Sequence, residues 1–543
     1  MPLGRRAFLK ILGFTIPALT LLRCGSNTSD PSDLSHLSDP PDPVTPPNPF
    51  TLSDPFNLSD PFNPPDPFNP SDPFNPSDPS DLSTSTDPSD TTSFLSLSSN
   101  PIIEENKKPG TVTWRIAQAS KNREIEGYAG QSSINRGESI KLFVSTAESS
   151  YKLEVFRLGW YGGAGGRRVF GPITLNGMQQ AMPVPDAETG LIECDWTNPF
   201  ILQTSENWTT GVYLVLLTAN GSGKQRYIPF TLRDDTGVSQ LMFQTSVTTY
   251  QAYNNWGGKS FYPAISTNKI AAVKVSLNRP YVNDHGAGQL LRWELNMVRF
   301  LEREGYDVAY CCNIATHNDP DLLQHRKAFL SVGHDEYWSF EMRRNITDAR
   351  DRGVHLGFFS ANTCYWQIRL APSTVTAAPN RTIICYKNRD KDPLFGHDNA
   401  RVTVRWRNNP VWQPEERLIG TQFTAQGRGD IVVSNATHWI FNGTGLGNGD
   451  RLPGLAGYEI DRTFGNGPAN LIRLCSSPII TSDNTVKIAE MTIYTAASGA
   501  LVFATGSIQF SWGLDGWGGN VSHPQVVNTA AQRMVVNLLS QFS

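Results

Sequence analysis

The stretch Phe329-Leu-Ser-Val-Gly-His-Asp-Glu-Tyr-Trp338 decides how this chain is read. Its apolar start ends at Gly333 and is followed by three ionisable residues, 334–336. This order predicts a buried strand that delivers polar groups to the carboxyl edge of a parallel sheet. Burying such groups side by side is costly unless they bind a ligand or each other. A solvated turn with a helix N-cap at Asp335 or Ser339 is the alternative.

Strand-like and helix-like segments alternate on both sides of this stretch. Apolar runs that predict strands lie at 241–244, 273–276, 307–310, 328–332, 354–359 and 500–504. Helices are predicted at 290–304, 320–324, 340–352 and 525–539. This alternation is typical of a doubly wound, mostly parallel sheet with helices on both faces. The pattern predicts an α/β domain over 237–543 that contains a β-rich insertion from 382 to about 493.

The region from 106 to 236 has a different pattern. Short alternating runs at 139–144, 151–156 and 212–217 are separated by turns rich in Gly and Asn. Short strands at this spacing predict a β-sandwich of immunoglobulin-like type. The glycine-rich loop at 157–166 lacks the lysine and the following helix of a phosphate loop, which argues against nucleotide binding there.

The first hundred residues read as export and tethering segments. Arg5-Arg6 precedes an apolar run at 11–22 that is shorter than the ~20 residues needed to cross a bilayer, so 1–24 predicts a twin-arginine signal. Cys24 is a candidate for lipidation and a membrane tether. Residues 25–105 are rich in Pro, Asp and Ser, with Asp-Pro-Phe-Asn repeated from Asp54, and predict a disordered stalk. We therefore expect a protein in the periplasm or at the cell surface.

Composition excludes some classes of partner. The net charge is −4, and no basic stretch large enough to bind phosphates is visible, which argues against nucleic acid as a partner. The seven cysteines include no Cys-x-x-Cys pair, so neither a zinc ribbon nor a thioredoxin-type motif is predicted.

Several polar segments at the ends of predicted strands carry a family resemblance. They are Gly-His-Asp-Glu-Tyr-Trp at 333–338, Tyr-Gln-Ala-Tyr-Asn-Asn-Trp at 250–256, Asn-Arg-Pro-Tyr at 278–281, Phe-Ser-Ala-Asn-Thr-Cys at 359–364 and Gly-Tyr-Glu-Ile-Asp at 457–461. In combination they resemble the catalytic domain of the large subunit of N,N-dimethylformamidase. The resemblance implies a glutamine-amidotransferase-like fold whose usual Cys nucleophile is replaced, because Ala361 or Asn362 occupies the turn and Cys364 lies beyond it.

The resemblance also implies a metal. Enzymes of this family use one Fe(III) held by two tyrosinates and a glutamate, here Tyr253, Tyr281 and Glu336, with Tyr250 as a substitute for Tyr253. Hard anionic oxygens match a hard trivalent ion. Such an ion polarises an amide carbonyl and stabilises the phenolate form of tyrosine. Alternatively, both tyrosines are aromatic core residues with hydrogen-bonded hydroxyls.

Three further residues receive catalytic roles. His334 is two residues from Glu336, so an extended segment places both on one face, and His334 is a candidate proton carrier. Asn362 is a candidate to orient a carbonyl or oxyanion, and Glu459 is a candidate general base. The alternatives are a structural histidine, a helix cap at Asn362 and an ion pair between Glu459 and Arg462.

The function predicted from these features is an exported, iron-dependent amidohydrolase that cleaves the C–N bond of a small amide. Two other hypotheses stay open: a hydrolase that uses Cys364 with His334, and a non-catalytic surface protein that binds a polymer. A small partner subunit or a homo-oligomer is compatible with the resemblance.

Overall fold

The computed structural model describes residues 100–481, 483–518 and 526–542. The predicted signal segment, Cys24 and the predicted stalk up to residue 99 lie outside these residues. Within the described part of the chain, no helix combines the length and apolarity needed to cross a membrane.

Two sheets form the part of the chain that follows helix α1 (Pro101–Asn106). One has the order β1-β3-β6 and the other β2-β8-β7-β4-β5. Leu142 from the first and Leu153 and Val215 from the second share one apolar cluster, so the sheets pack as a β-sandwich. The immunoglobulin-like topology stays a prediction. The strand bounds are β1 Ile125–Ala129, β2 Ser133–Asn135, β3 Ser139–Thr146, β4 Ser150–Leu158, β5 Gly166–Asn176, β6 Phe200–Gln203, β7 Gly211–Ala219 and β8 Gln225–Arg233.

A ten-stranded sheet forms the centre of the rest of the chain. Its parallel half has the order β11-β9-β12-β14-β22, so that, numbered along the chain, the strands run 2-1-3-4-5. This is a doubly wound order with a switch point beside its first strand, β9. The bounds are β9 Leu241–Thr245, β11 Val308–Cys312, β12 Ala328–Gly333, β14 His355–Ser360 and β22 Leu501–Ala504.

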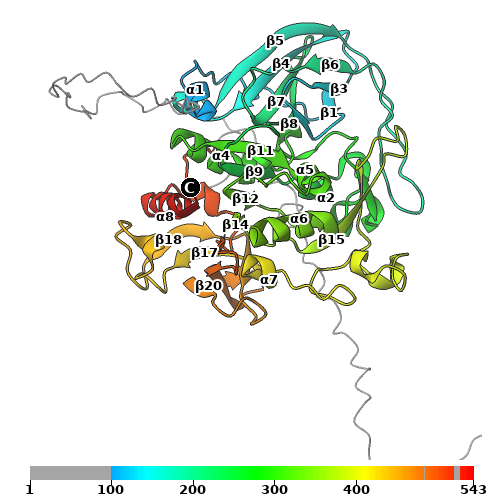
Figure 1. Ribbon diagram of the computed structural model, residues 1–543. Helices are drawn as coiled ribbons and strands as arrows, with labels where there is room; N and C mark the ends of the chain where they lie inside the picture. The colour runs from blue at the N-terminus through cyan, green and yellow to red at the C-terminus, as the bar shows by residue number, and fades with distance from the viewer. Residues whose placement is uncertain (1–99, 482, 519–525, 543) are drawn as a thin grey trace, which may run out of the picture. The chain divides into compact units, whose positions relative to one another are not determined.

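Helices cover both faces of this parallel half (Figure 1). Phe243 and Leu330 belong to the apolar cluster that contains residues of α4 and α8, whereas their neighbours Met242 and Phe329 belong to the cluster with α5 and α6. Alternate strand residues therefore pack on opposite helical layers. The helix bounds are α2 Val247–Tyr253, α3 Leu290–Trp293, α4 Leu295–Arg303, α5 Asn313–Asn318, α6 Phe340–Asp351, α7 Glu416–Ile419 and α8 Thr529–Phe542. The likeness to glutamine amidotransferases stays a prediction.

The other half of the large sheet is antiparallel and continues from β22 as β21-β20-β17-β18, with β19 paired to β17. A separate four-stranded sheet has the order β10-β16-β15-β13. These strands include the β-rich region predicted after residue 382. Their bounds are β10 Lys274–Ser276, β13 Tyr337–Ser339, β15 Trp366–Ala371, β16 Thr382–Ile384, β17 Gln422–Val432, β18 Arg451–Ala456, β19 Glu459–Arg462, β20 Ile472–Thr481 and β21 Val486–Thr495.

Three predicted helices differ from the observed ones, and one of them, expected at 525–539, is observed as α8 at Thr529–Phe542. The helix expected over 290–304 is broken at Glu294, whose buried carboxylate accepts the backbone N–H of Ser246 at 3.1 Å. The helix expected at 320–324 is a turn, and the short helix of this region, α5, begins directly after β11. Long-range hydrogen bonds of Asn313 and Thr316 hold α5 in place. Tertiary hydrogen bonds therefore outweigh local periodicity at 290–304 and 320–324.

Helix α1 lies inside the range predicted as stalk, 25–105, so residues 101–105 are helical and that boundary is wrong. Asn100 caps the helix by accepting the N–H of Ile102 and also donates to the carbonyl of Gly305. Ile102 is fully buried in the same apolar cluster as residues of α4. Residues 100–106 are therefore part of the folded body.

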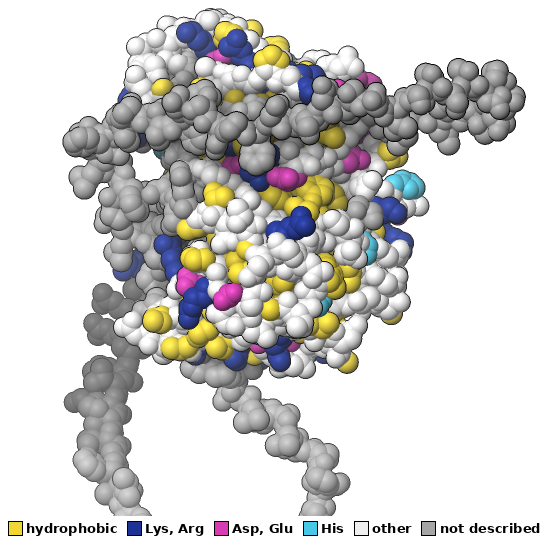
Figure 2. Space-filling model, turned by 90° about the vertical axis from the view of Figure 1, so that its left-hand side faces the viewer, with side chains coloured by type: hydrophobic (Ala, Val, Ile, Leu, Met, Phe, Trp, Pro, Cys, Tyr) yellow, Lys and Arg dark blue, Asp and Glu magenta, His cyan; other side chains and the backbone are white. Residues whose placement is uncertain are grey.

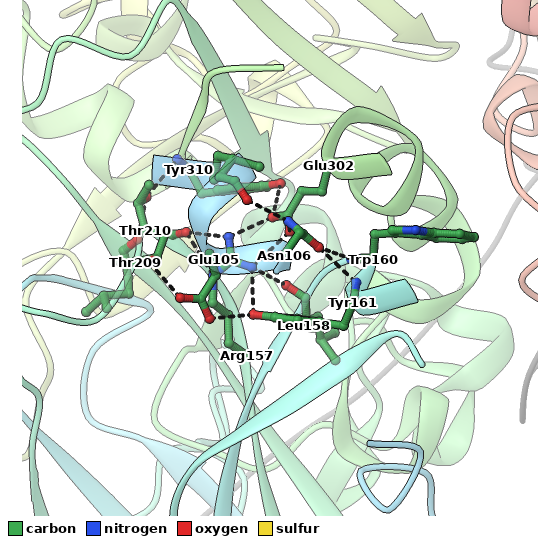
Figure 3. Close-up of polar contacts among 12 residues, drawn as sticks. Glu105, Asn106, Arg157, Leu158, Trp160, Tyr161, Thr209, Thr210, Glu302 and Tyr310 are labelled. Carbon is green, nitrogen blue, oxygen red and sulfur yellow. Dashed lines mark hydrogen bonds and ion pairs between the residues drawn. The ribbon is translucent and has the colours of Figure 1, made fainter. Parts of the chain in front are cut away.

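A buried polar network connects α1, the sandwich and α4 (Figure 3). Arg157 of β4 donates two hydrogen bonds to the carboxylate of Glu302, at 2.9 and 2.7 Å, and both side chains are fully buried. The Tyr310 hydroxyl and the Asn106 amide also donate to Glu302. Glu105 accepts from Tyr161. We call these residues the Arg157–Glu302 network.

Charges of both signs are mixed on the face shown in Figure 2. Where its side chains are coloured, Lys and Arg lie singly or in small groups among uncharged side chains. The coloured part of this face offers no continuous basic surface.

Candidate functional site

The polar segments predicted to form a site converge at the carboxyl ends of the parallel strands. Glu336 follows β12, Tyr253 ends the helix that follows β9, and Asn362 follows β14. Glu459 reaches the same place from β19 of the antiparallel half, as its contacts below show. Ligand sites of open α/β sheets lie at this edge, at the point where the strand order reverses, here between β9 and β12.

The turn after β12 is tightly constrained. Gly333 has φ +72°, and a Cβ at this position would lie 2.5 Å from Cβ of Trp293, so only glycine fits. The carbonyl of Glu336 accepts the N–H groups of Tyr365 and Trp366, at 2.8 and 3.0 Å. The backbone on both sides of His334-Asp335-Glu336 is therefore fixed before any ligand binds.

Two phenols surround the carboxylate of Glu336. Tyr253 donates to Oε2 at 2.7 Å, and the hydroxyl of Tyr262 lies 3.0 Å from Oε1 and 3.1 Å from Oε2. The hydroxyl of Tyr337 donates in turn to that of Tyr262 at 2.6 Å. Burial and the charge of Glu336 raise the pKa of Tyr253 and Tyr262 well above the ordinary value of tyrosine. Neither phenol would ionise here without a strong cation.

His334 lies between two carboxylates. Its Nε2 is 3.2 Å from Oε2 of Glu336 and 3.2 Å from Oε2 of Glu459. Burial alone would lower the pKa of His334, but the charges of Glu459 and Glu336 raise it to about 10. His334 is therefore an imidazolium at neutral pH whose Nε2 contacts are ion pairs, and neither of its ring nitrogens makes a hydrogen bond among the described residues.

Glu459 is held by three neighbours. The Asn362 amide donates to its Oε2 at 2.9 Å and the Gln426 amide to its Oε1 at 3.0 Å, while His334 provides the charge. Burial raises the pKa of Glu459, but the His334 charge and these hydrogen bonds outweigh burial and hold it below the ordinary value. Glu459 is a carboxylate at neutral pH. The alternative pairing with Arg462 is not among its described contacts.

Asn362 adopts a left-handed conformation, with φ +52°, directly after β14. Its backbone N–H donates to Asp461 at 2.8 Å, and its side-chain Oδ1 has no partner among the described residues. Asn362 therefore presents an acceptor to the site while its amide nitrogen is engaged with Glu459. The hydrogen bond to Asp461 holds the backbone of Asn362 in this position.

Asp335 points away from this cluster. Its carboxylate accepts hydrogen bonds from Gln244 at 2.7 Å, Ser331 at 2.9 Å and Asn313 at 2.9 Å. It is a structural anchor under the turn, and it neither caps a helix nor joins Glu336.

Tyr281 occupies a different place. Its ring lies 6.0 Å from that of Tyr250 and lines a pocket with Arg279 and Tyr128. It makes no hydrogen bond with Glu336, Tyr253 or Tyr262 in the described structure. The structure thus brings together Tyr253, Glu336, His334, Asn362 and Glu459, and it places Tyr262 where the sequence predicted Tyr281.

Cys364 is poorly placed to be a nucleophile. Its side chain is fully buried in an apolar cluster, and burial raises the pKa of its thiol far above the ordinary range. Its sulfur lies 3.9 Å from a guanidinium nitrogen of Arg343, whereas Nε2 of His334 faces carboxylates. The geometry gives no support to a pair formed by Cys364 and His334.

An aromatic and cationic wall borders the Glu336 side of the site. The ammonium of Lys387 lies 3.7 Å from the ring centroid of Tyr262, and Arg405 lies 5.4 Å from the centroid of Trp366. Burial lowers the pKa of Lys387 to about 8, which leaves it protonated at neutral pH.

The donor set fits a hard metal ion. Among the described residues, no group of three or more His, Cys, Asp and Glu side chains is arranged to hold a metal. Tyrosine is not one of those four residue types. Here the hydroxyl oxygens of Tyr253 and Tyr262 both lie within 3.1 Å of a carboxylate oxygen of Glu336. All-oxygen ligands of this kind favour Fe(III) over a softer ion. Tyr253, Tyr262 and Glu336 therefore fit the iron implied by the resemblance.

Comparison with known proteins identifies the family of this chain. Residues 152–525, which include every site residue named above, match the family described as N,N-dimethylformamidase beta subunit-like, C-terminal. The chain is also 23% identical to the N,N-dimethylformamidase beta subunit of Alcaligenes sp, over 65% of this chain and 55% of that protein. The chain thus spans about half the length of this relative.

Proposed function

Because the chain belongs to the family of N,N-dimethylformamidase beta subunit-like C-terminal domains, we propose that it hydrolyses the C–N bond of an amide, with iron bound at Glu336. One observation carries this proposal. Two phenols and a carboxylate converge at the switch point of the sheet, and a buried His334–Glu459 pair lies beside them.

Tyr253, Tyr262 and Glu336 would hold the ion. Fe(III) bound there would polarise the amide carbonyl and supply the charge that favours phenolate over phenol. The protein contributes a rigid backbone around Glu336 and a buried, oxygen-rich environment.

Glu459, His334 and Asn362 would carry out and support the proton transfers. Glu459 is ionised and buried, so it can accept a proton from the attacking water and return it to the departing nitrogen. A C–O bond forms, the C–N bond breaks, and the products are a carboxylic acid and an amine. His334 keeps Glu459 ionised, and Asn362 fixes its orientation through Nδ2. The free Oδ1 of Asn362 can accept an N–H of the amide.

The test is iron content and visible absorption of purified protein. We expect about one iron per chain and a band from tyrosinate coordination. Tyr253→Phe and Tyr262→Phe should each reduce both signals, because each removes one of three anionic ligands. Tyr281→Phe is the matched control and should keep them. Loss of iron with Tyr281→Phe, together with retention in Tyr262→Phe, would instead support the ligand set predicted from the sequence. Iron-free protein in all cases would refute the proposal.

We also propose export through the twin-arginine route, on the basis of Arg5-Arg6 and the apolar run after them. Replacing both arginines by lysine should leave precursor in the cytoplasm, as fractionation would show. Unchanged export would refute this route. Labelling with a fatty acid would test lipidation at Cys24.

A further inference from the structure

Lys387 is a cation in the wall of the site whose ammonium forms no described ion pair or hydrogen bond, although the charge of Glu336 acts on it. Its ammonium lies 3.7 Å from the ring centroid of Tyr262, 4.9 Å from that of Trp366 and 5.4 Å from that of Tyr337. Among the described residues, no carboxylate or hydrogen-bond acceptor is paired with it. Its backbone has φ +59°, a conformation that is unfavourable for a residue with a side chain. The chain therefore accepts local strain to hold this ammonium among three rings.

The aromatic rings compensate only part of the cost of that position. Cation–π contacts stabilise an ammonium, but less than a paired carboxylate does when both are sheltered from water. The nearby carboxylate of Glu336 is already engaged by Tyr253, Tyr262 and His334. Lys387 thus keeps an unused capacity to bind an anion.

A second cation lies on the same aromatic surface. The Arg405 guanidinium is 5.4 Å from the centroid of Trp366, the ring that Lys387 also contacts, and 5.3 Å from that of Tyr365. Positive charges gathered on one ring repel each other, and an anion between them would relieve the repulsion. The N–H groups of Tyr365 and Trp366 donate to the carbonyl of Glu336, so this surface is fixed relative to the reacting centre.

We propose that Lys387, with Arg405 beside it, binds an anionic group of the substrate, and hence that the substrate is an amide bearing a carboxylate. The inference rests on the proposed amide hydrolysis at Glu336. It specifies the substrate class: the amide carbonyl lies at Tyr253, Tyr262 and Glu336, and the carboxylate lies over Tyr262 and Trp366 against the ammonium.

The test compares two amides of equal size that release the same product. Formate release from N-formylglycine and from the neutral N-formylglycinamide is measured with the iron-loaded full chain. We expect kcat/KM to be at least ~10-fold higher for N-formylglycine, as is typical of a charge-assisted contact. Lys387→Met should bring this ratio close to one. Lys391→Met removes the same charge from an exposed position four residues away in the same loop and should leave the ratio unchanged.

Two results would overturn the inference while leaving amide hydrolysis intact. One is equal use of both amides by the wild type. The other is a Lys387→Met variant that is slower with both amides but keeps their ratio, because Lys387 would then only support the tyrosine rings.

A binding measurement separates this inference from the proposed function. Calorimetry with the Glu459→Gln variant records binding of the two amides without turnover. Preferential binding of N-formylglycine that is lost when Lys387→Met is added supports the anion site. If the wild type hydrolyses neither amide, that result counts against the proposed hydrolysis and not against the anion site. Equal binding of both amides refutes the anion site.

Discussion

The molecule contains two buried clusters of charge that differ in how completely they are paired. In the Arg157–Glu302 network, the guanidinium and the carboxylate meet through two hydrogen bonds, and Tyr310 and Asn106 satisfy the remaining lone pairs. In the Glu336 cluster, one imidazolium lies between two carboxylates, while both ring nitrogens of His334 and Oδ1 of Asn362 have no hydrogen-bond partner among the described residues.

The difference separates structure from function. A fully paired network leaves nothing for a ligand to contribute, and its residues fix one arrangement of the elements around it. A cluster that leaves buried polar atoms of His334 and Asn362 without partners is costly as it stands, and a bound ligand can satisfy them. Burial alone is equal in the two regions, so pairing distinguishes them.

The largest effect is expected from Arg157→Met. It leaves the carboxylate of Glu302 buried without its cation and should lower the free energy of unfolding by about 3–5 kcal/mol. Chemical denaturation measures this loss. Replacing both partners, with Arg157→Met and Glu302→Leu, should recover most of it. If the double variant is as unstable as the single one, the network contributes through packing instead of pairing.

Glu459→Gln should affect a different property: it should lower turnover and leave stability unchanged. Losing the general base should reduce kcat by about 10²–10³-fold, while iron content and the unfolding midpoint stay close to wild type. Glu416→Gln is the control, because that buried carboxylate accepts the backbone N–H groups of Phe464, Gly465 and Asn466 and none from the proposed site residues. It should reduce stability and spare turnover per iron. A marked loss of stability in Glu459→Gln would make its cluster structural.

Shortening the N-terminus tests the reach of the Arg157–Glu302 network. A chain that begins at Asn100 should unfold at the same temperature as the full chain. One that begins at Lys107 loses buried Ile102 and Glu105 and should be less stable by about 2–3 kcal/mol. Equal melting temperatures for the two truncations would show that α1 contributes nothing to the body.

The smallest effect is a pH dependence at Asp461. Burial raises the pKa of this carboxyl to about 7, against a hydrogen bond from the Asn362 backbone that lowers it. In the unfolded chain the pKa is about 3.9, so the folded protein binds more protons between these values and loses stability as the pH rises from about 4 to 7. Asp461→Asn should remove on the order of 1–2 kcal/mol of this decline in iron-free protein. Parallel curves for both proteins would contradict the assignment.

Much of the sheet follows from local signals in the sequence. Strand β12 and helix α6 match their predicted ranges within one residue, because Gly333 ends the strand and the Ser339 side chain caps the helix by accepting the N–H of Met342. Helix α5 was missed because polar side chains with distant partners hold it, and no periodicity reports such partners.

The site residues that lie next to a strand could be predicted from the sequence. Glu336, His334, Asn362 and Glu459 all follow or begin a strand, and the structure brings them together. Tyr262 follows no strand: it reaches Glu336 from an irregular loop, so its phenol looked like any other aromatic residue. Lys387 gave no signal either, since only the folded chain shows that rings surround its ammonium.

The alternation of His334, Asp335 and Glu336 between two sides has a consequence for how this turn can change. The two neighbouring carboxylates have different partners. Asp335 accepts hydrogen bonds from Gln244 and Asn313, whereas Glu336 faces the phenols. Deleting or inserting one residue after Gly333 would turn Asp335 toward the phenols and Glu336 toward Gln244 and Asn313. Substitutions could be absorbed one at a time, but a change in length could not. The spacing between Gly333 and Glu336 is therefore a feature that protein engineering should leave untouched.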